Sequence, residues 1–133
     1  MKLQISTDYA VRILQHLHSH KGELLTAMEI AESTGMTYPF FIKIASQLKK
    51  KDLLNSTQGR KGGYQLGKPA CEISLYDVFL CIEGELQLNR CRGEEAPCFQ
   101  GEINVCKLHE FFDELQRKVI AEMSELSIAD LTL

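Results

Sequence analysis

Residues 26–66 read TAMEIAESTGMTYPFFIKIASQLKKKDLLNSTQGRKGGYQL, and the order of the structural signals in this stretch predicts the architecture. Thr26 followed three residues later by Glu29 is a capping-box signature, because each residue can satisfy a backbone amide of the other. The signature predicts a short helix over residues 27–34. Gly35 ends this helix, since glycine accepts the left-handed conformation that often follows a last turn.

A second helix follows from residue 37 or 38, with Pro39 in its first turn, where the missing amide costs no hydrogen bond. Its apolar side chains recur at helical spacing and are Phe40, Phe41, Ile44 and Leu48. Short strands over residues 53–57 and 64–66 then flank a glycine-rich turn. A helix, a turn, a helix and a hairpin in this order predict a winged helix-turn-helix.

Three further helices surround this unit. The first is predicted over residues 6–20, with Ser6 or Thr7 as its cap. A second begins after its cap, Ser74, and ends near residue 82. The last covers residues 106–126. The last helix carries a continuous apolar stripe of Leu108, Phe112, Leu115, Val119, Met123 and Leu126. A small winged domain needs less than this for its own core, so the stripe predicts a dimer seam rather than packing within one domain.

The expected fold class is therefore mainly α with a small β wing, divided into three segments. Residues 1–84 form the winged helix-turn-helix, residues 85–105 a loop, and residues 106–133 a dimerisation helix with a C-terminal tail. No apolar run approaches the roughly 20 residues that span a bilayer, and no secretory signal is evident. We therefore expect a cytoplasmic protein with no membrane partner. Its thiols stay reduced there, and the odd count of five cysteines also argues against a disulfide framework.

Charge is divided unevenly along the chain, although the net charge is only −3. Residues 1–70 hold ten Lys/Arg and five Asp/Glu, a balance of +5, whereas residues 71–133 hold five and thirteen, a balance of −8. A basic half suits a polyanion such as double-stranded DNA. Residues 43–61 concentrate six Lys/Arg against a single acidic residue. This density favours DNA binding over the alternative, a solvated helix face and a soluble turn.

Candidate DNA contacts come from the second helix of the motif and from the hairpin tip. They are Thr37, Tyr38, Lys43, Lys49, Lys50, Arg60 and Lys61. The first three lie early in the helix, whose N-terminal residues approach base edges in the major groove. The two later lysines are expected to meet phosphates, which position the protein without reading sequence. The two hairpin cations suit a narrow minor groove.

A second group of residues points to metal chemistry. Cys91, Cys98, Cys106 and His109 fall within nineteen residues, with six and then seven residues between successive cysteines. Structural zinc sites use tight pairs two to four residues apart, and only Cys106 and His109 are that close. The long gaps favour an iron–sulfur cluster held by a wrapping loop, over zinc or oxidation-sensitive free thiols. Cys71 and Cys81 are expected to be small buried residues instead.

The sequence resembles the IscR/NsrR-type family of bacterial winged-helix transcription regulators over nearly its whole length. The matching segments are STDYAVRIL, AMEIAESTGM, GRKGGYQL, ISLYDVFLCIEG and the C…APC…CKLH loop before a long helix. The resemblance implies a homodimer on a roughly palindromic operator. It also implies three cysteine ligands to a 2Fe–2S or 4Fe–4S cluster. The fourth ligand would be a histidine matching His109, or an acidic residue of the partner subunit matching Asp8.

The resemblance further implies a regulator, most often a repressor, whose cluster senses redox state, nitric oxide or iron status. Family members that discriminate between DNA sites carry a polar or acidic residue where this chain has Phe41-Ile42-Lys43, so no site preference carries over. No catalytic constellation is present, and we expect no enzyme. Two alternatives stay open: a cluster-free regulator controlled by a partner protein, zinc or thiol oxidation, and a small iron–sulfur redox carrier.

Overall fold

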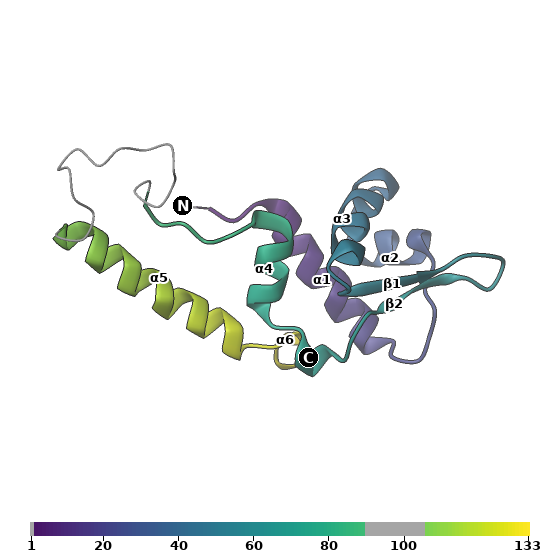
Figure 1. The fold of residues 1–133 in the computed structure, drawn as a ribbon. Helices are drawn as coiled ribbons and strands as arrows, with labels where there is room; N and C mark the ends of the chain where they lie inside the picture. The colour runs from purple at the N-terminus through teal and green to yellow at the C-terminus, as the bar shows by residue number, and fades with distance from the viewer. Residues whose placement is uncertain (1, 90–105) are drawn as a thin grey trace.

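The computed structural model describes residues 2–89 and 106–133, and its elements follow the predicted order (Figure 1). They are α1 Ile5–Ser19, α2 Ala27–Thr34, α3 Tyr38–Lys50, β1 Leu54–Thr57, β2 Gly63–Leu66, the 3-10 helix η1 Ala70–Glu72, α4 Leu75–Glu83, α5 Lys107–Glu125 and α6 Ile128–Leu131. The predicted fold class, mainly α with a small β wing, is confirmed.

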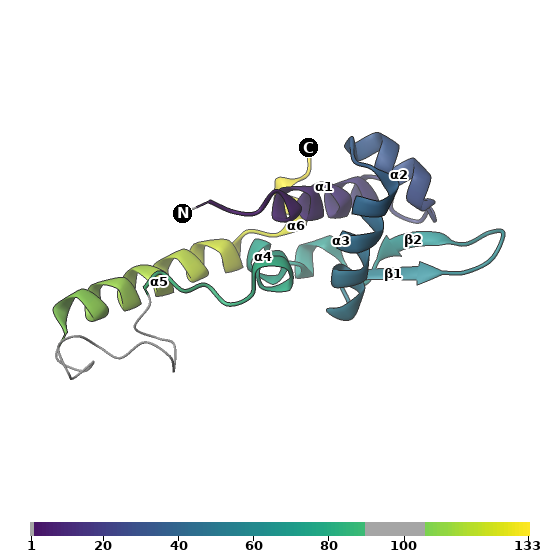
Figure 2. The ribbon, with the colours of Figure 1, turned by 90° about the horizontal axis from the view of Figure 1, so that it is seen from above.

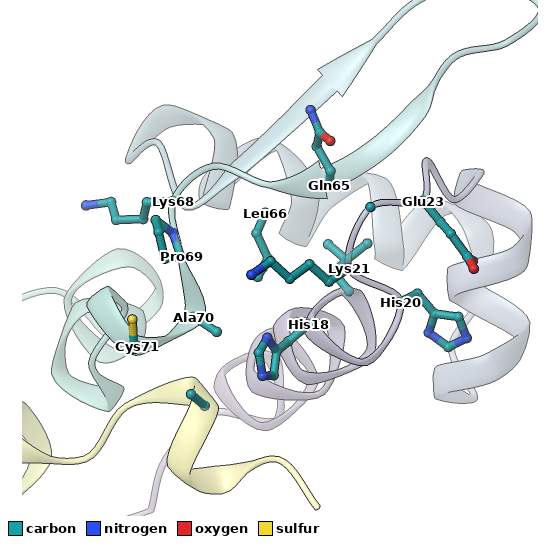
Figure 3. Close-up of a pocket in the computed structure, with 13 residues that line it drawn as sticks. His18, His20, Lys21, Glu23, Gln65, Leu66, Lys68, Pro69, Ala70 and Cys71 are labelled. Carbon is teal, nitrogen blue, oxygen red and sulfur yellow. The ribbon is translucent and has the colours of Figure 1, made fainter.

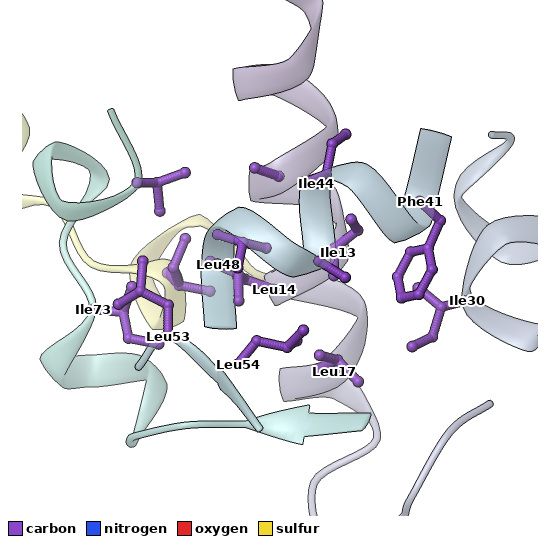
Figure 4. Close-up of a cluster of buried hydrophobic side chains, with 14 of the residues drawn as sticks. Ile13, Leu14, Leu17, Ile30, Phe41, Ile44, Leu48, Leu53, Leu54 and Ile73 are labelled. Carbon is purple, nitrogen blue, oxygen red and sulfur yellow. The ribbon is translucent and has the colours of Figure 1, made fainter. Parts of the chain in front are cut away.

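The hydrophobic core is built around α1, which packs against α2, α3, α4 and α6. The side chains at its centre are fully shielded from solvent and include Ile13, Leu14, Phe41, Ile44 and Leu48 (Figure 4). Burying a side chain of this kind contributes roughly 1.5–3 kcal/mol. The apolar spacing of α1 and α3 thus brings both helices together and leaves their polar faces outside.

The wing is an antiparallel hairpin in which Leu54 pairs with Leu66 and Thr57 with Gly63. Its second strand also pairs with Leu25, whose amide donates to the Tyr64 carbonyl at 3.2 Å and whose carbonyl accepts from the Tyr64 amide at 2.7 Å. A Cβ on Gly63 would lie 2.7 Å from the Leu25 carbonyl oxygen, so only glycine fits at this close approach. This pairing fixes the hairpin to the segment before α2.

The predicted capping box of α2 is confirmed, with Glu29 N donating to Thr26 Oγ1 at 3.2 Å. Gly35 ends α2 in the left-handed conformation, at φ 75°. The predicted cap of α1 is wrong: Gln4 is the N-cap residue, and neither predicted side chain caps the helix. The physical reason is that Thr7 lies inside the first turn, where its buried hydroxyl donates to a distant carboxylate.

A short C-terminal helix, α6, was not expected from the sequence. A capping box between Ser127 and Asp130 begins it, and Ile128 is fully buried in the core. The chain before α6 also joins the segment before α4, because Leu75 N donates to Leu126 O at 2.7 Å and Ile128 N donates to Ile73 O at 2.9 Å. The end of α5 is therefore attached to the same core as the wing.

Helix α5 itself extends away from the core, at the end of the molecule opposite the hairpin (Figures 1 and 2). Gln116 is the one buried residue of this helix in the described chain, and its Oε1 accepts from the Leu88 amide at 3.1 Å. Leu108 and Phe111 are 63% and 60% exposed. The described chain thus leaves these two apolar side chains of α5 largely uncovered, and the dimer seam remains a prediction.

Candidate nucleic-acid interface and metal site

The exposed face of α3 begins with a capped first turn. Thr37 Oγ1 accepts from Phe40 N at 3.4 Å, which fixes the start of the helix. Tyr38 is 49% exposed beside it. Lys43 and Lys49 are exposed further along the helix, and so is Lys50. All the residues expected to contact DNA from α3 are therefore accessible to a ligand.

The inner face of α3 packs against the wing. The rings of Phe41 and Tyr64 meet edge to face with centroids 5.1 Å apart. Burial raises the pKa of the Tyr64 hydroxyl, and the nearby Tyr38 raises it further, so Tyr64 stays uncharged at neutral pH. This contact joins the recognition-helix candidate to strand β2, so the two basic elements are held in a fixed relation.

The hairpin tip carries Arg60 and Lys61, both exposed. Neither cation forms an ion pair with any residue in the described parts of the chain, and the same holds for Lys43, Lys49 and Lys50. Helix α3 and the hairpin lie at the same end of the molecule, away from α5 (Figure 2). The fold thus gathers unpaired positive charge at one end, which is the electrostatic requirement for binding a polyanion.

The second candidate site lies at the start of α5. Cys106 is the half-buried N-cap residue, and His109 follows in the first turn. The Nδ1 atom of His109 is buried and has no hydrogen-bond partner among the described residues. Buried polar atoms are rarely left without a partner, so this nitrogen suits a ligand supplied from elsewhere. Cys91 and Cys98 lie outside the described residues.

Asp8, the alternative ligand, is placed differently. Its carboxylate is 59% exposed and pairs with the Arg12 guanidinium at 3.0 Å, and that guanidinium also lies 5.1 Å from the Tyr9 ring centroid. No three His, Cys, Asp or Glu side chains come together as a metal site within residues 2–89 and 106–133. A single chain therefore does not bring Asp8 to Cys106 and His109.

The two remaining cysteines have different environments. Cys81 is half-buried and its thiol donates to the Gln47 carbonyl of α3 at 3.1 Å; burial raises the pKa of this thiol, although Lys51 lowers it in part. The prediction that Cys71 is buried is wrong: the residue is exposed, because η1 buries Ala70, the residue before it. Cys71 borders a cavity of about 350 Å³ whose lining includes Lys21 and Lys68 (Figure 3).

Glu83, which the sequence reading missed, joins two distant elements. As the last residue of α4, it accepts hydrogen bonds from Gln4 N at 2.6 Å, Gln4 Nε2 at 3.0 Å and Thr7 Oγ1 at 2.7 Å. Burial alone would raise the pKa of this carboxyl, but the hydrogen bonds from Thr7 and Gln4 outweigh it and hold the pKa below its ordinary value. No local sequence signal reveals the contact, because its partners are 79 and 76 residues away.

Comparison with known proteins places these features in a class, that of winged-helix transcriptional regulators. The chain belongs to the Rrf2 family, described as iron-dependent transcriptional regulators, whose model matches residues 3–132. A relative is the HTH-type transcriptional regulator IscR of Photorhabdus laumondii subsp. laumondii, which is 31% identical over 133 residues covering 98% of this chain and 79% of the relative. The chain is thus an IscR-like transcriptional regulator, as the resemblance implied.

Solved structures share the fold at lower sequence identity. CymR, the global cysteine regulator of B. subtilis, superposes with a TM-score of 0.79 at 20% identity, covering 98% of this chain and 95% of CymR. T. potens IscR gives a TM-score of 0.76 at 20% identity, covering 98% and 85%. These likenesses confirm the winged helix-turn-helix. Within its described parts, the chain has no helix both long and apolar enough to cross a membrane.

Proposed function

We propose that this chain acts as a homodimeric DNA-binding regulator, most often a repressor in this family, whose operator affinity depends on an iron–sulfur cluster. The observation that carries the cluster part is the buried Nδ1 of His109, which lacks a hydrogen-bond partner among the described residues, in the turn that Cys106 begins. A thiolate and an imidazole three residues apart form half of a Cys₃His ligand set. Cys91 and Cys98 are proposed as the other half.

His109 is a better candidate than Asp8 for the fourth ligand within one chain. The Asp8 carboxylate already pairs with Arg12, whereas His109 Nδ1 has no competing hydrogen bond from a described residue. When bound, an iron–sulfur cluster would supply iron that reacts with small oxidants such as nitric oxide. The role of the three thiolates is to hold this group beside α5. A single histidine among three cysteines would make the site more labile than four cysteines.

DNA binding is supported by the cations of α3 and the hairpin, which form no ion pair with any described residue. Lys43 is exposed in the helix expected to enter the major groove, and Arg60 and Lys61 are exposed at the tip of the wing. A lysine that donates hydrogen bonds to a base edge contributes roughly 1–3 kcal/mol of discrimination between the right and the wrong base. A cation on a phosphate contributes affinity that falls with salt. The two kinds of contact together would give a regulator both position and sequence preference.

Dimerisation is supported by α5, whose Leu108 and Phe111 are largely exposed in one chain. An uncovered apolar face of this kind on a long helix suits a second copy of the same helix. Two-fold symmetry in the protein would match an operator with two half-sites. We therefore assign the assembly to α5 and the reading of DNA to α3 and the wing.

The test compares the protein with and without its cluster on the same DNA. The protein is reconstituted anaerobically, its absorption spectrum and its iron and sulfide content are recorded, and a duplex selected from a random library is titrated by fluorescence anisotropy. We expect operator affinity to differ by about 5–150-fold between the two forms. His109→Ala should lower the iron content, whereas Lys107→Ala, at the exposed neighbouring position, should not. Equal affinity of both forms rules out the sensor.

A second candidate function, regulation by thiol oxidation without a cluster, is favoured by the exposure of Cys71. An accessible thiol can be oxidised reversibly to a sulfenic acid or a disulfide. Peroxide treatment of the cluster-free protein separates the two proposals. A change in operator affinity that persists in Cys106→Ser but disappears in Cys71→Ser would favour the thiol mechanism.

A further inference from the structure

The start of α1 and the end of α4 meet through one carboxylate. Two donors from Gln4, just before α1, and one from Thr7, in its first turn, converge on Glu83 at 2.6, 3.0 and 2.7 Å. Gln4 is the N-cap of α1 but makes no side-chain cap of its own. The first amides of a helix have no partner within the helix and favour a negative charge beside them. Glu83 therefore acts as the cap of α1 from the end of another helix.

This contact is costly to lose because one of its donors, the Thr7 hydroxyl, is almost fully buried. Thr7 is 2% exposed, so its hydroxyl has little access to water when the carboxylate moves away. A buried hydroxyl without a partner is destabilising. The start of α1 thus has two states: one in which Glu83 accepts these hydrogen bonds, and one of higher free energy in which it does not. A residue with this property can couple the position of one helix to that of another.

Glu83 also lies in the chain between the DNA-reading elements and the segment that leads to α5. Gly84 ends α4, and residues 85–89 lead toward α5, where Gln116 holds the Leu88 amide at 3.1 Å. On the other side, α1 packs against both α2 and α3. Glu83 is thus the point where the segment that precedes the candidate cluster ligands bonds to the helix that supports the DNA-reading elements.

We propose that Glu83 is the positioning residue through which the state of the metal site reaches α1 and hence α3. This inference rests on the proposed cluster-dependent function and assigns a residue to its regulation. Glu83 need not touch either the cluster or DNA. Its role is to hold α1 in the position that α1 occupies in one of the two forms of the protein, the cluster-bearing or the cluster-free form, which differ in operator affinity.

The rest of α4 is held independently of Glu83, which makes the role testable. Val78 and Phe79 are buried in α4, and the Cys81 thiol donates to the Gln47 carbonyl of α3. Removing the carboxylate charge should therefore leave α4 packed and α3 folded. The predicted defect is a loss of coupling between two sites, and a loss of fold is not expected.

The experiment measures operator affinity for the cluster-bearing and cluster-free forms of the wild type, Glu83→Gln and Glu85→Gln. Glu85 is an exposed carboxylate two residues further on and serves as the matched control. We expect the ratio of the two dissociation constants to fall to within about twofold of one in Glu83→Gln, with iron and sulfide content unchanged. Glu85→Gln should keep the wild-type ratio. Thr7→Val removes one donor at nearly constant volume and should give an intermediate ratio.

The outcomes separate this inference from the function on which it rests. A wild-type ratio of one overturns the cluster-dependent function and the coupling role with it. A wild-type ratio that Glu83→Gln leaves unchanged overturns the coupling role alone. If Glu83→Gln loses the near-ultraviolet circular dichroism of the folded protein, Thr7→Val decides: an unchanged ratio in that variant counts against the proposal, and a reduced ratio supports it.

Discussion

The winged helix-turn-helix and α5 differ in where their apolar side chains lie. In the former, Ile13, Phe41 and Leu48 are fully buried around α1. In α5, Gln116 alone among its described side chains is buried, while Phe111 is 60% exposed. The first region has a complete core within one chain, and the second has apolar side chains that the rest of the described chain leaves exposed. The core of the winged region thus accounts for folding, whereas assembly through α5 is a proposal that variants of this helix can test.

The largest expected effect tests whether the hydrophobic core of the winged region is complete within one chain. Phe41→Ala removes a fully buried ring that contacts Tyr64. The transfer and cavity terms together should lower the free energy of unfolding by about 3–5 kcal/mol. Urea denaturation followed by circular dichroism measures this. Phe40→Ala, at the partly exposed neighbouring position, is the control and should cost clearly less. Equal costs at both positions would contradict the proposed core.

Phe111→Ser tests the other side of the comparison. Because the ring is 60% exposed, the stability of the single chain should change by less than about 0.5 kcal/mol. The dimer dissociation constant should instead rise at least about tenfold, since an apolar anchor would be lost from the seam. Sedimentation velocity over a concentration series measures it. Lys118→Ser, at another exposed position of α5, should leave dissociation unchanged. A dimer equally stable in both variants would place the seam elsewhere.

The next effect concerns charge rather than packing. Replacing both Arg60 and Lys61 by Gln should reduce the slope of log affinity against log salt by about 2, because each phosphate contact contributes about 0.9. Replacing Arg117 and Lys118 by Gln removes the same charge from α5 and should leave the slope unchanged. Both slopes come from anisotropy titrations at several salt concentrations. If the α5 double variant lowered the salt slope as much as the hairpin double variant, the slope would depend on net charge alone and not on where the cations lie.

The smallest effect concerns pH within the winged region. Burial lowers the pKa of His16 below its usual value of 6.5, and the neighbouring His20 lowers it further. The folded state therefore binds fewer protons than the unfolded state as pH falls through this range. Stability contributed by neutral His16 is present above that range and is lost in acid. Thermal unfolding should show His16→Gln losing less stability than the wild type between pH 8 and pH 5.5. Parallel losses would assign the acid sensitivity to another group.

Local signals were sufficient for most of the fold. The capping box at Thr26, the stop at Gly35 and the spacing through Leu48 each depend on residues close in sequence, and the structure confirms all three. Capping of α1 was predicted wrongly for the opposite reason. Thr7 is followed by helical residues, as a cap would be, but its hydroxyl serves a carboxylate 76 residues away.

The candidate site could be predicted only in part. Residue type and spacing were enough to propose the cysteines and His109 as ligands, and charge was enough to propose the cations of α3 and the hairpin. Burial is set by tertiary packing, so no local pattern indicates that Cys71 is exposed or that His109 Nδ1 lies buried without a hydrogen bond to any described residue. Helix α6 escaped prediction because four residues are too few to show a helical period.

The attachment of α6 to the core has a mechanical consequence for α5. Ile128 is buried beside α1, and backbone hydrogen bonds tie Leu126 and Ile128 to the segment before α4. The C-terminal end of α5 is therefore fixed to the core, and its 19 residues reach about 28 Å from that attachment. A tilt of about 5° displaces the Cys106 end by about 2.5 Å over that length. A small rotation of α5 about its attachment to the core thus corresponds geometrically to an ångström-scale displacement at the candidate ligands Cys106 and His109.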